Sequence, residues 1–315
     1  MADIHSYFAS VNACIGQRSG GRLASILALP LRGVEAQHRL LAEKARGINL
    51  ISYATSNVSE AGVAAVVGHR LLAVTALVSS DLRKAYEHEL AAYNSVLEYL
   101  KEENSTWILP ALIRTSDDLR QLAIQVDSAS SGNDFLRNSL ENLTKGFTAV
   151  AKDRTPVSSP GSKKHALFAV TNVLFKIYFR VNTLQLCSKL ISVIDGPSGA
   201  GENLHLYPLS DVAMYKYYLG RLKLFEDKQE EAREHLRFAL RHTPLGLMKN
   251  RQRILASLIP VEMSLGVMPT DLVATKYGFH EYLAMANAAK IGDLRSLEKV
   301  HCIWYGALLT YTGSE

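Results

Sequence analysis

The segment 215–244, YKYYLGRLKLFEDKQEEAREHLRFALRHTP, constrains the fold of this chain more than any other. Its small and apolar residues stand at the offsets of a tetratricopeptide-type hairpin, in which two helices pack closely. Gly220 and Ala232 predict a close approach of the two backbones, and Pro244 cannot continue the second helix. One hairpin cannot bury its apolar face alone, so we expect further hairpins stacked beside it. The residues assigned to this structural hairpin are Leu219, Gly220, Ala232, Leu236, Ala239 and Pro244.

Helical periodicity continues on both sides of the hairpin, and strand signals are almost absent up to residue 300. The first 60 residues predict short helices whose bounds the pattern does not define. The fold class is therefore all-α, built from TPR-like stacked hairpins. The expected helices are 81–100 with Asp81 as N-cap, 107–126, 135–151, 165–180, 184–194, 251–265, one starting at Thr270, and 280–290, with turns at Asn182–Thr183 and Gly292–Asp293.

The segment 152–164, KDRTPVSSPGSKK, is the clearest loop, because it gathers proline, serine, glycine and charged residues. We expect it to separate an N-terminal helical region, 1–151, from a helical-repeat region, 165–300. A divergent tail, 301–315, follows.

Catalytic and metal-binding patterns are missing from the sequence. The three cysteines share no CxxC spacing, and the histidines form no HExxH motif. Glu202 stands where a phosphate-binding loop needs lysine, so 196–203 is interpreted as a connection. We therefore predict no catalytic residue, no metal and no cofactor, and a protein that is not an enzyme. The apolar stretch Val63–Val78 is interrupted by His69 and Arg70, which favours a core helix over a membrane span.

The whole chain has a formal net charge of +5, and its positive charge is concentrated in the second half. Between Val212 and Arg253, ten Lys and Arg residues face five Asp and Glu residues. This excess favours an acidic partner, either nucleic acid or protein, with a solvated helical face as an equally weighted alternative. The candidate nucleic-acid-binding residues are Lys216, Arg221, Lys223, Arg237, Arg241, Lys249, Arg251 and Arg253.

Aromatic residues stand beside basic ones in two places. Phe175, Tyr178 and Phe179 flank Lys176, and Tyr215, Tyr217 and Tyr218 flank Lys216. Such interleaving is compatible with a stacking surface for single-stranded nucleic acid. The helical spacing favours core packing instead, roughly three to one.

Several blocks, in order over about 220 residues, resemble the PCI-domain-containing protein 2 family, the PCI subunit of the nuclear transcription–export complex. A related family that could be confused with it is the signalosome-associated PCI subunit. The resembling blocks are KEENSTWILP (101–110), DLRQLA (118–123), NVLFKIYFRVNTLQLCSKLISVID (172–195), YKYYLGRLKLFEDKQEEAREHLRFAL (215–240), KNRQRILASLIPVEMSLGVMPTDLVATKYG (249–278) and LAMANAAKIGDLRSLEKV (283–300).

This resemblance implies a right-handed PCI helical-repeat solenoid leading into a winged helix. After Val300 only 15 residues follow, so we expect the winged helix to be missing. It also implies a large scaffold partner of the GANP type, a small acidic disordered partner, and weak binding of RNA or DNA by basic surfaces. The implied function is a scaffold coupling transcription to mRNA export in the nucleus, with the cytoplasm as a second location. The alternative is a signalosome- or proteasome-associated PCI scaffold without a nucleic-acid role.

Overall fold

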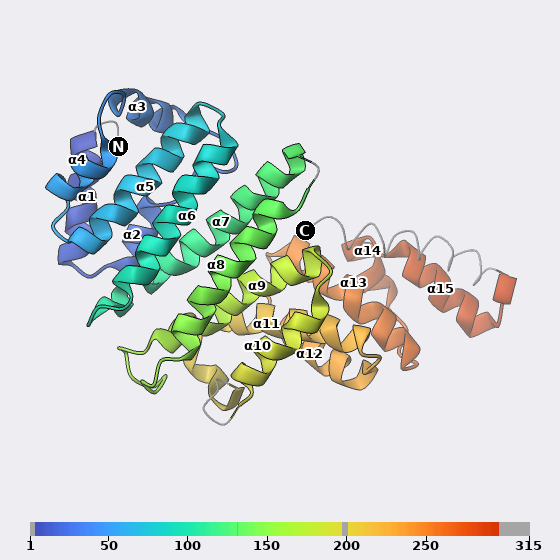
Figure 1. The fold of residues 1–315 in the computed structure, drawn as a ribbon. Helices are drawn as coiled ribbons and strands as arrows, with labels where there is room; N and C mark the ends of the chain where they lie inside the picture. The colour runs from blue at the N-terminus through green and yellow to red at the C-terminus, as the bar shows by residue number, and fades with distance from the viewer. Residues whose placement is uncertain (1–3, 131, 197–200, 296–315) are drawn as a thin grey trace. The chain divides into compact units, whose positions relative to one another are not determined.

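The computed structural model describes residues 4–130, 132–196 and 201–295 (Figure 1). Within these ranges the chain forms fifteen α-helices and four short 3₁₀ helices and no strand, so the all-α prediction is confirmed. The α-helices are α1 Ile4–Gly16, α2 Gly20–Ile26, α3 Ala36–Lys44, α4 Leu50–Asn57, α5 Ala61–Val78, α6 Leu82–Tyr99, α7 Leu109–Ser130, α8 Asp134–Ala151, α9 Leu167–Arg180, α10 Cys187–Ile194, α11 Leu209–Phe225, α12 Gln229–Arg241, α13 Met248–Ser264, α14 Asp271–Tyr277 and α15 His280–Ile291. The 3₁₀ helices are η1 Ser105–Ile108, η2 Lys163–Ala166, η3 Leu184–Leu186 and η4 Gly201–Leu206.

The helix ends follow local rules that the sequence already shows. The side chain of Asp81 accepts a hydrogen bond from the backbone N–H of Lys84 over 3.1 Å, which confirms the predicted cap of α6. Asn182 adopts a φ of 54° in the predicted turn after α9. Gly292 ends α15 in the left-handed conformation, with a φ of 78°. Most of the segment 294–300 and the whole tail 301–315 lie outside the described residues, as do residues 197–200 of the glycine-rich connection.

The chain divides into two compact units, which are described separately. The first contains residues 1–177 and 193–200, and the second contains residues 178–192 and 201–315. The segment 152–164 lies inside the first unit. Asp153 organises it by accepting hydrogen bonds from the backbone N–H groups of Thr155 at 3.0 Å and Lys163 at 2.6 Å.

Helix α5 is the centre of the first unit. It packs against α3, α4 and α6, and α6 packs in turn against α7 (Figure 1). By length and composition alone α5 is apolar enough to cross a membrane, yet 61% of it is buried inside the protein. Its burial against three helices and the charge on Arg70 agree with the predicted core helix.

A buried charge cluster joins α5, α6 and α7. The guanidinium of Arg70 donates to the carboxyl of Glu89, to Asp118 Oδ2 at 2.7 Å and to the carbonyl of Leu27. All three side chains are at most 1% exposed. Asp118 Oδ2 also accepts from Arg114 at 3.1 Å. A buried charge is tolerated only when it is paired and hydrogen-bonded, so this cluster determines how the three helices meet.

In the second unit, α11 packs against α12, α12 against α13, and α14 against α15. Pro260 lies inside α13 and has no N–H, so the carbonyl of Ala256 loses its donor within the helix. The hydroxyl of Tyr282 in α15 donates to that carbonyl over 3.3 Å. The same tyrosine packs with Leu255 and Ile259 in the core between α13 and α15. The Tyr282 hydroxyl thus supplies the hydrogen bond that Pro260 cannot donate to Ala256.

The buried carboxyl of Glu89 makes stability depend on pH. Burial raises its pKa from 4.5 to about 8, against the opposing attraction of Arg70. Folded Glu89 therefore holds its proton more tightly than unfolded Glu89. Its contribution to the free energy of unfolding is complete below about pH 4.5 and declines as the pH rises towards about 8. We expect the thermal midpoint of Glu89→Gln to fall less over this range than that of the parent chain, because the amide does not titrate.

The matched control is Glu98→Gln, which neutralises an exposed carboxylate on the same helix, where the side chain of Glu98 is 72% exposed. Melting curves by circular dichroism at several pH values compare the three proteins. A parent chain and a Glu89→Gln variant with the same pH dependence would contradict the prediction.

Candidate nucleic-acid interface

The predicted hairpin corresponds to α11 and α12. Gly220 lies at the contact between them, where an added Cβ would stand 2.7 Å from Leu236 Cγ and 3.2 Å from the carbonyl oxygen of Ala232. Ala232, Leu236 and Ala239 are fully buried, and Leu219 is 5% exposed. Pro244 lies three residues beyond the end of α12, in the connection to α13. The close approach requires a residue without a side chain at position 220.

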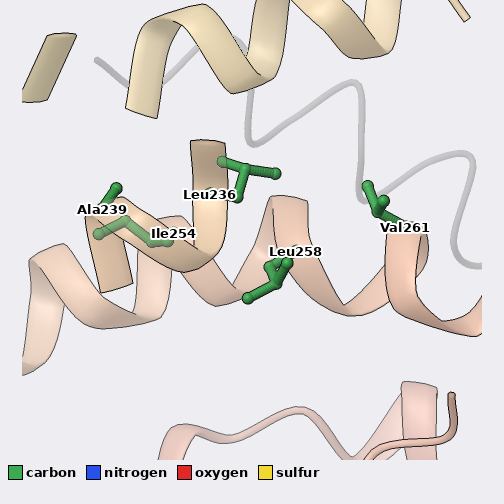
Figure 2. Packing of buried hydrophobic residues seen from close by; sticks show 5 residues of the cluster. All are labelled: Leu236, Ala239, Ile254, Leu258 and Val261. Atoms are coloured by element: carbon green, nitrogen blue, oxygen red, sulfur yellow. The ribbon is translucent and has the colours of Figure 1, made fainter. Parts of the chain in front are cut away.

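Helix α12 also packs on α13. Figure 2 shows the buried cluster that joins them, and every labelled residue in it is aliphatic. Fully burying one leucine side chain contributes about 1.5–3 kcal/mol, so this contact fixes the position of α13 beside α12. The cluster consists of Leu236, Ala239, Ile254, Leu258 and Val261.

Contacts inside the second unit engage Lys223, Arg237, Arg251 and Arg221, among the eight predicted basic residues. Lys223 forms ion pairs with Glu226 at 3.0 Å and Glu231 at 3.2 Å. Arg237 Nε lies 2.7 Å from Glu262 Oε1, which links α12 to α13. Each of these cations is partly neutralised, which reduces the charge available to a phosphate.

Arg251 is a structural residue. Its Nη1 donates to the carbonyls of Leu240 at 3.0 Å and Thr243 at 2.7 Å, which are orphan acceptors at the end of α12. Its Nε donates to the hydroxyl of Tyr277 at 2.9 Å. The guanidinium therefore connects α12, α13 and α14. A role in phosphate binding stays a prediction for this residue.

The fourth engaged cation is Arg221, whose guanidinium carbon lies 4.5 Å from the centroid of the Phe179 ring and 5.6 Å from that of Tyr217. Cation–π stacking of this kind holds the guanidinium plane against the aromatic faces while leaving its charge in place.

Arg241, Lys249 and Arg253 are exposed and form no ion pair among the described residues. Arg241 ends α12, and the other two begin α13 one helical turn apart, which places them on one face. All three thus lie around the α12–α13 connection. Their side chains carry the strongest unneutralised positive charge among the eight predicted residues, which makes this connection the candidate phosphate-contacting surface.

Lys216 belongs to a different face of the hairpin. Burial, together with the positive charges of Lys216 and Lys223, lowers the pKa of His235 on α12 to about 4. The imidazole is therefore neutral at physiological pH. Burial is the larger cause of this shift, and the two lysines add to it.

A groove of about 920 Å³ lies next to the exposed cations. Its walls include Leu255 and Ile259 of α13 and Val273 of α14, and Arg241 stands at its rim. Leu245, in the α12–α13 connection, also lines it and is 68% exposed. Sequence reasoning did not identify this groove or the exposed ring of Phe225, because both depend on which faces the neighbouring helices leave uncovered.

Comparisons with known proteins agree with this architecture. The family described as PSMD3-like, N-terminal TPR repeats, matches residues 138–284. The chain is 28% identical to a PCI domain-containing protein 2 homolog of Dictyostelium discoideum over 74% of the chain and 56% of that protein. It is 33% identical to PCI domain-containing protein 2 of Xenopus laevis over 71% of the chain and 57% of that protein. It is 31% identical to Enhanced ethylene response protein 5 of Arabidopsis thaliana over 65% of the chain and 48% of that protein. The chain thus matches about half the length of these relatives.

The contact at Gly220 generates a stability prediction. Gly220→Leu should lower the free energy of unfolding by about 2–3 kcal/mol, because the added side chain overpacks the space already filled by Leu236. Gly246→Ala is the control, since nothing lies within 4 Å of a Cβ at that position. Thermal melting checks both variants. A Gly220→Leu midpoint equal to or above that of the parent would contradict the assignment of Gly220 to the close contact between α11 and α12.

Proposed function

The chain belongs to the family of PCI domain-containing protein 2, and we propose that it is a non-enzymatic scaffold subunit of a nuclear complex that couples transcription to mRNA export. The observation that best supports a role in this complex is the group of exposed cations at the α12–α13 connection, within the region that matches helical repeats. Stacked helical repeats usually present extended surfaces to partners, and the basic face adds an attraction for polyanions.

The proposed partners follow the family resemblance. A large scaffold of the GANP type binds the helical stack, and a small acidic disordered subunit binds beside it. RNA or DNA binds weakly to the basic surface. The exposed apolar residues around the groove of the second unit support protein docking, because apolar patches on a folded surface commonly mark binding sites.

Co-purification tests the complex that the chain joins. A tagged full-length chain is captured from nuclear extract, and the recovered proteins are identified by mass spectrometry. The proposal expects a GANP-type scaffold in stoichiometric amount. Recovery of signalosome or proteasome subunits in its place would support the alternative scaffold role without nucleic acid. A parallel capture with the Gly220→Leu variant shows whether recovery depends on the intact helical stack.

Nucleic-acid binding should depend on salt through the three exposed cations. Replacing Arg241, Lys249 and Arg253 together with glutamine should reduce the slope of log K against log salt by about 2 units, because each phosphate contact on a single strand releases about 0.7 counterion. Fluorescence anisotropy with a labelled oligonucleotide over a salt series measures the slope.

The matched control replaces Lys276, Lys290 and Arg295 with glutamine. These residues belong to α14, α15 and the segment after it, and the change removes the same net charge. A slope that falls equally in both triple variants would indicate only a general effect of net charge. An unchanged slope in the first triple variant would exclude the α12–α13 connection as the phosphate-contacting surface.

A further inference from the structure

The outward side of α11 carries a stripe of unusual composition. Met214, Tyr217, Arg221 and Phe225 recur at intervals of three or four residues, which places them on one face of the helix. Met214 is 36% exposed and Phe225 is 62% exposed, while Tyr217 and Arg221 are half-buried. Gly220, on another face of the helix, packs on α12. Tyr217 also packs against the α12–α13 cluster, so the stripe extends from this helix contact to the exposed side chains of Met214 and Phe225. Three of its four residues are apolar or aromatic.

Flat side chains in this region lie against one another. Phe179, in the last turn of α9, has its ring centroid 5.2 Å from that of Tyr218 and 6.2 Å from that of Phe225. The guanidinium of Arg221 covers the Phe179 ring at 4.5 Å. The rings are tilted by 50° and 55° to one another, and with the guanidinium they form a connected cluster that ends at Phe225. Most of the Phe225 side chain faces solvent, so the cluster has an open edge.

The charge around the stripe favours an anionic ligand that also has flat faces. The carboxylate of Glu226, next to Phe225, is bound by Lys223 at 3.0 Å and Lys228 at 3.1 Å, so its negative charge is offset. Arg221 stands in the middle of the stripe, and Arg180 is exposed next to Phe179. An apolar helix from a protein would have to desolvate the Arg221 guanidinium between Met214 and Phe225. A nucleobase can stack on the guanidinium plane without this cost.

We propose that Met214, Tyr217, Arg221 and Phe225 form a stacking platform for the bases of single-stranded nucleic acid. This inference rests on the proposed nucleic-acid role and gives it a site for bases in addition to the one for phosphates. Leu209, at the start of the same helix, lines the same groove as Arg241. The helix that carries the platform thus also reaches the groove beside Arg241. Recognition by π-faces tolerates any base, so binding is independent of sequence.

The test uses the full chain and two labelled probes of equal length, oligo-U and an abasic sugar–phosphate strand. Phe225→Ala weakens binding of oligo-U about tenfold and leaves binding of the abasic strand unchanged, because only the bases stack. Arg221→Lys keeps the charge and loses the guanidinium plane, so it weakens oligo-U selectively as well. Leu272→Ala is the control, since it removes an apolar side chain that is 77% exposed on α14.

The outcomes separate this inference from the function on which it rests. Salt-dependent binding of oligo-U that Phe225→Ala does not weaken overturns the platform and leaves the phosphate-contacting surface intact. A parent chain that binds neither probe overturns both. If Phe225→Ala leaves oligo-U binding unchanged and instead abolishes recovery of the scaffold protein, the stripe is a protein-docking face and the platform is overturned. An equal loss for the two probes also overturns it, because stacking cannot act on an abasic strand.

Discussion

Helix α12 depends on the two helices that cover it on either side, α11 and α13. Its leucine at position 236 fills the space that Gly220 leaves open on α11, and the same side chain belongs to the cluster with Ile254 and Leu258 on α13. A single side chain therefore contributes to both neighbouring contacts. Because the stability of such a stack is a sum of nearest-neighbour terms, a change at one helix–helix contact also alters the stability of the next helix.

The buried polar side chains of the two units either supply a hydrogen bond that a backbone group lacks or set the arrangement of neighbouring helices. Arg70 holds two carboxyl groups and a backbone carbonyl from separate elements, so the first unit has little freedom in how α5, α6 and α7 are arranged. Arg251 has a comparable effect at the end of α12, and Tyr282 supplies the donor that Pro260 lacks. Leaving any of these partners unpaired would cost more than the contact itself contributes, since buried polar groups lose their water.

Sequence reasoning predicts the features that depend on local spacing. The helical period, the Asp81 cap and the turn at Asn182 are properties of a few adjacent residues, and the structure contains them. The role of Arg251 could not be predicted in this way, because its acceptors lie eight and eleven residues away and its third partner is on α14. The short N-terminal helices also escaped placement. Position 20, at the start of α2, has no room for a side chain, because an added Cβ would lie 1.7 Å from the carbonyl oxygen of Trp107, a residue remote in sequence.

Contacts between residues remote in sequence also decide which cations of the charged surface are available to a partner. A count of Lys and Arg along α11–α13 treats every cation as equally available, although ion pairs, carbonyl capping and aromatic stacking engage four of the eight predicted residues. The polyanion affinity of such a surface depends on the cations that remain in solvent, because only those release counterions from a phosphate. Two of the engaged cations act indirectly instead. Arg237 and Arg251 hold α12 and α13 together, and the exposed Arg241, Lys249 and Arg253 keep their arrangement only while that joint is intact.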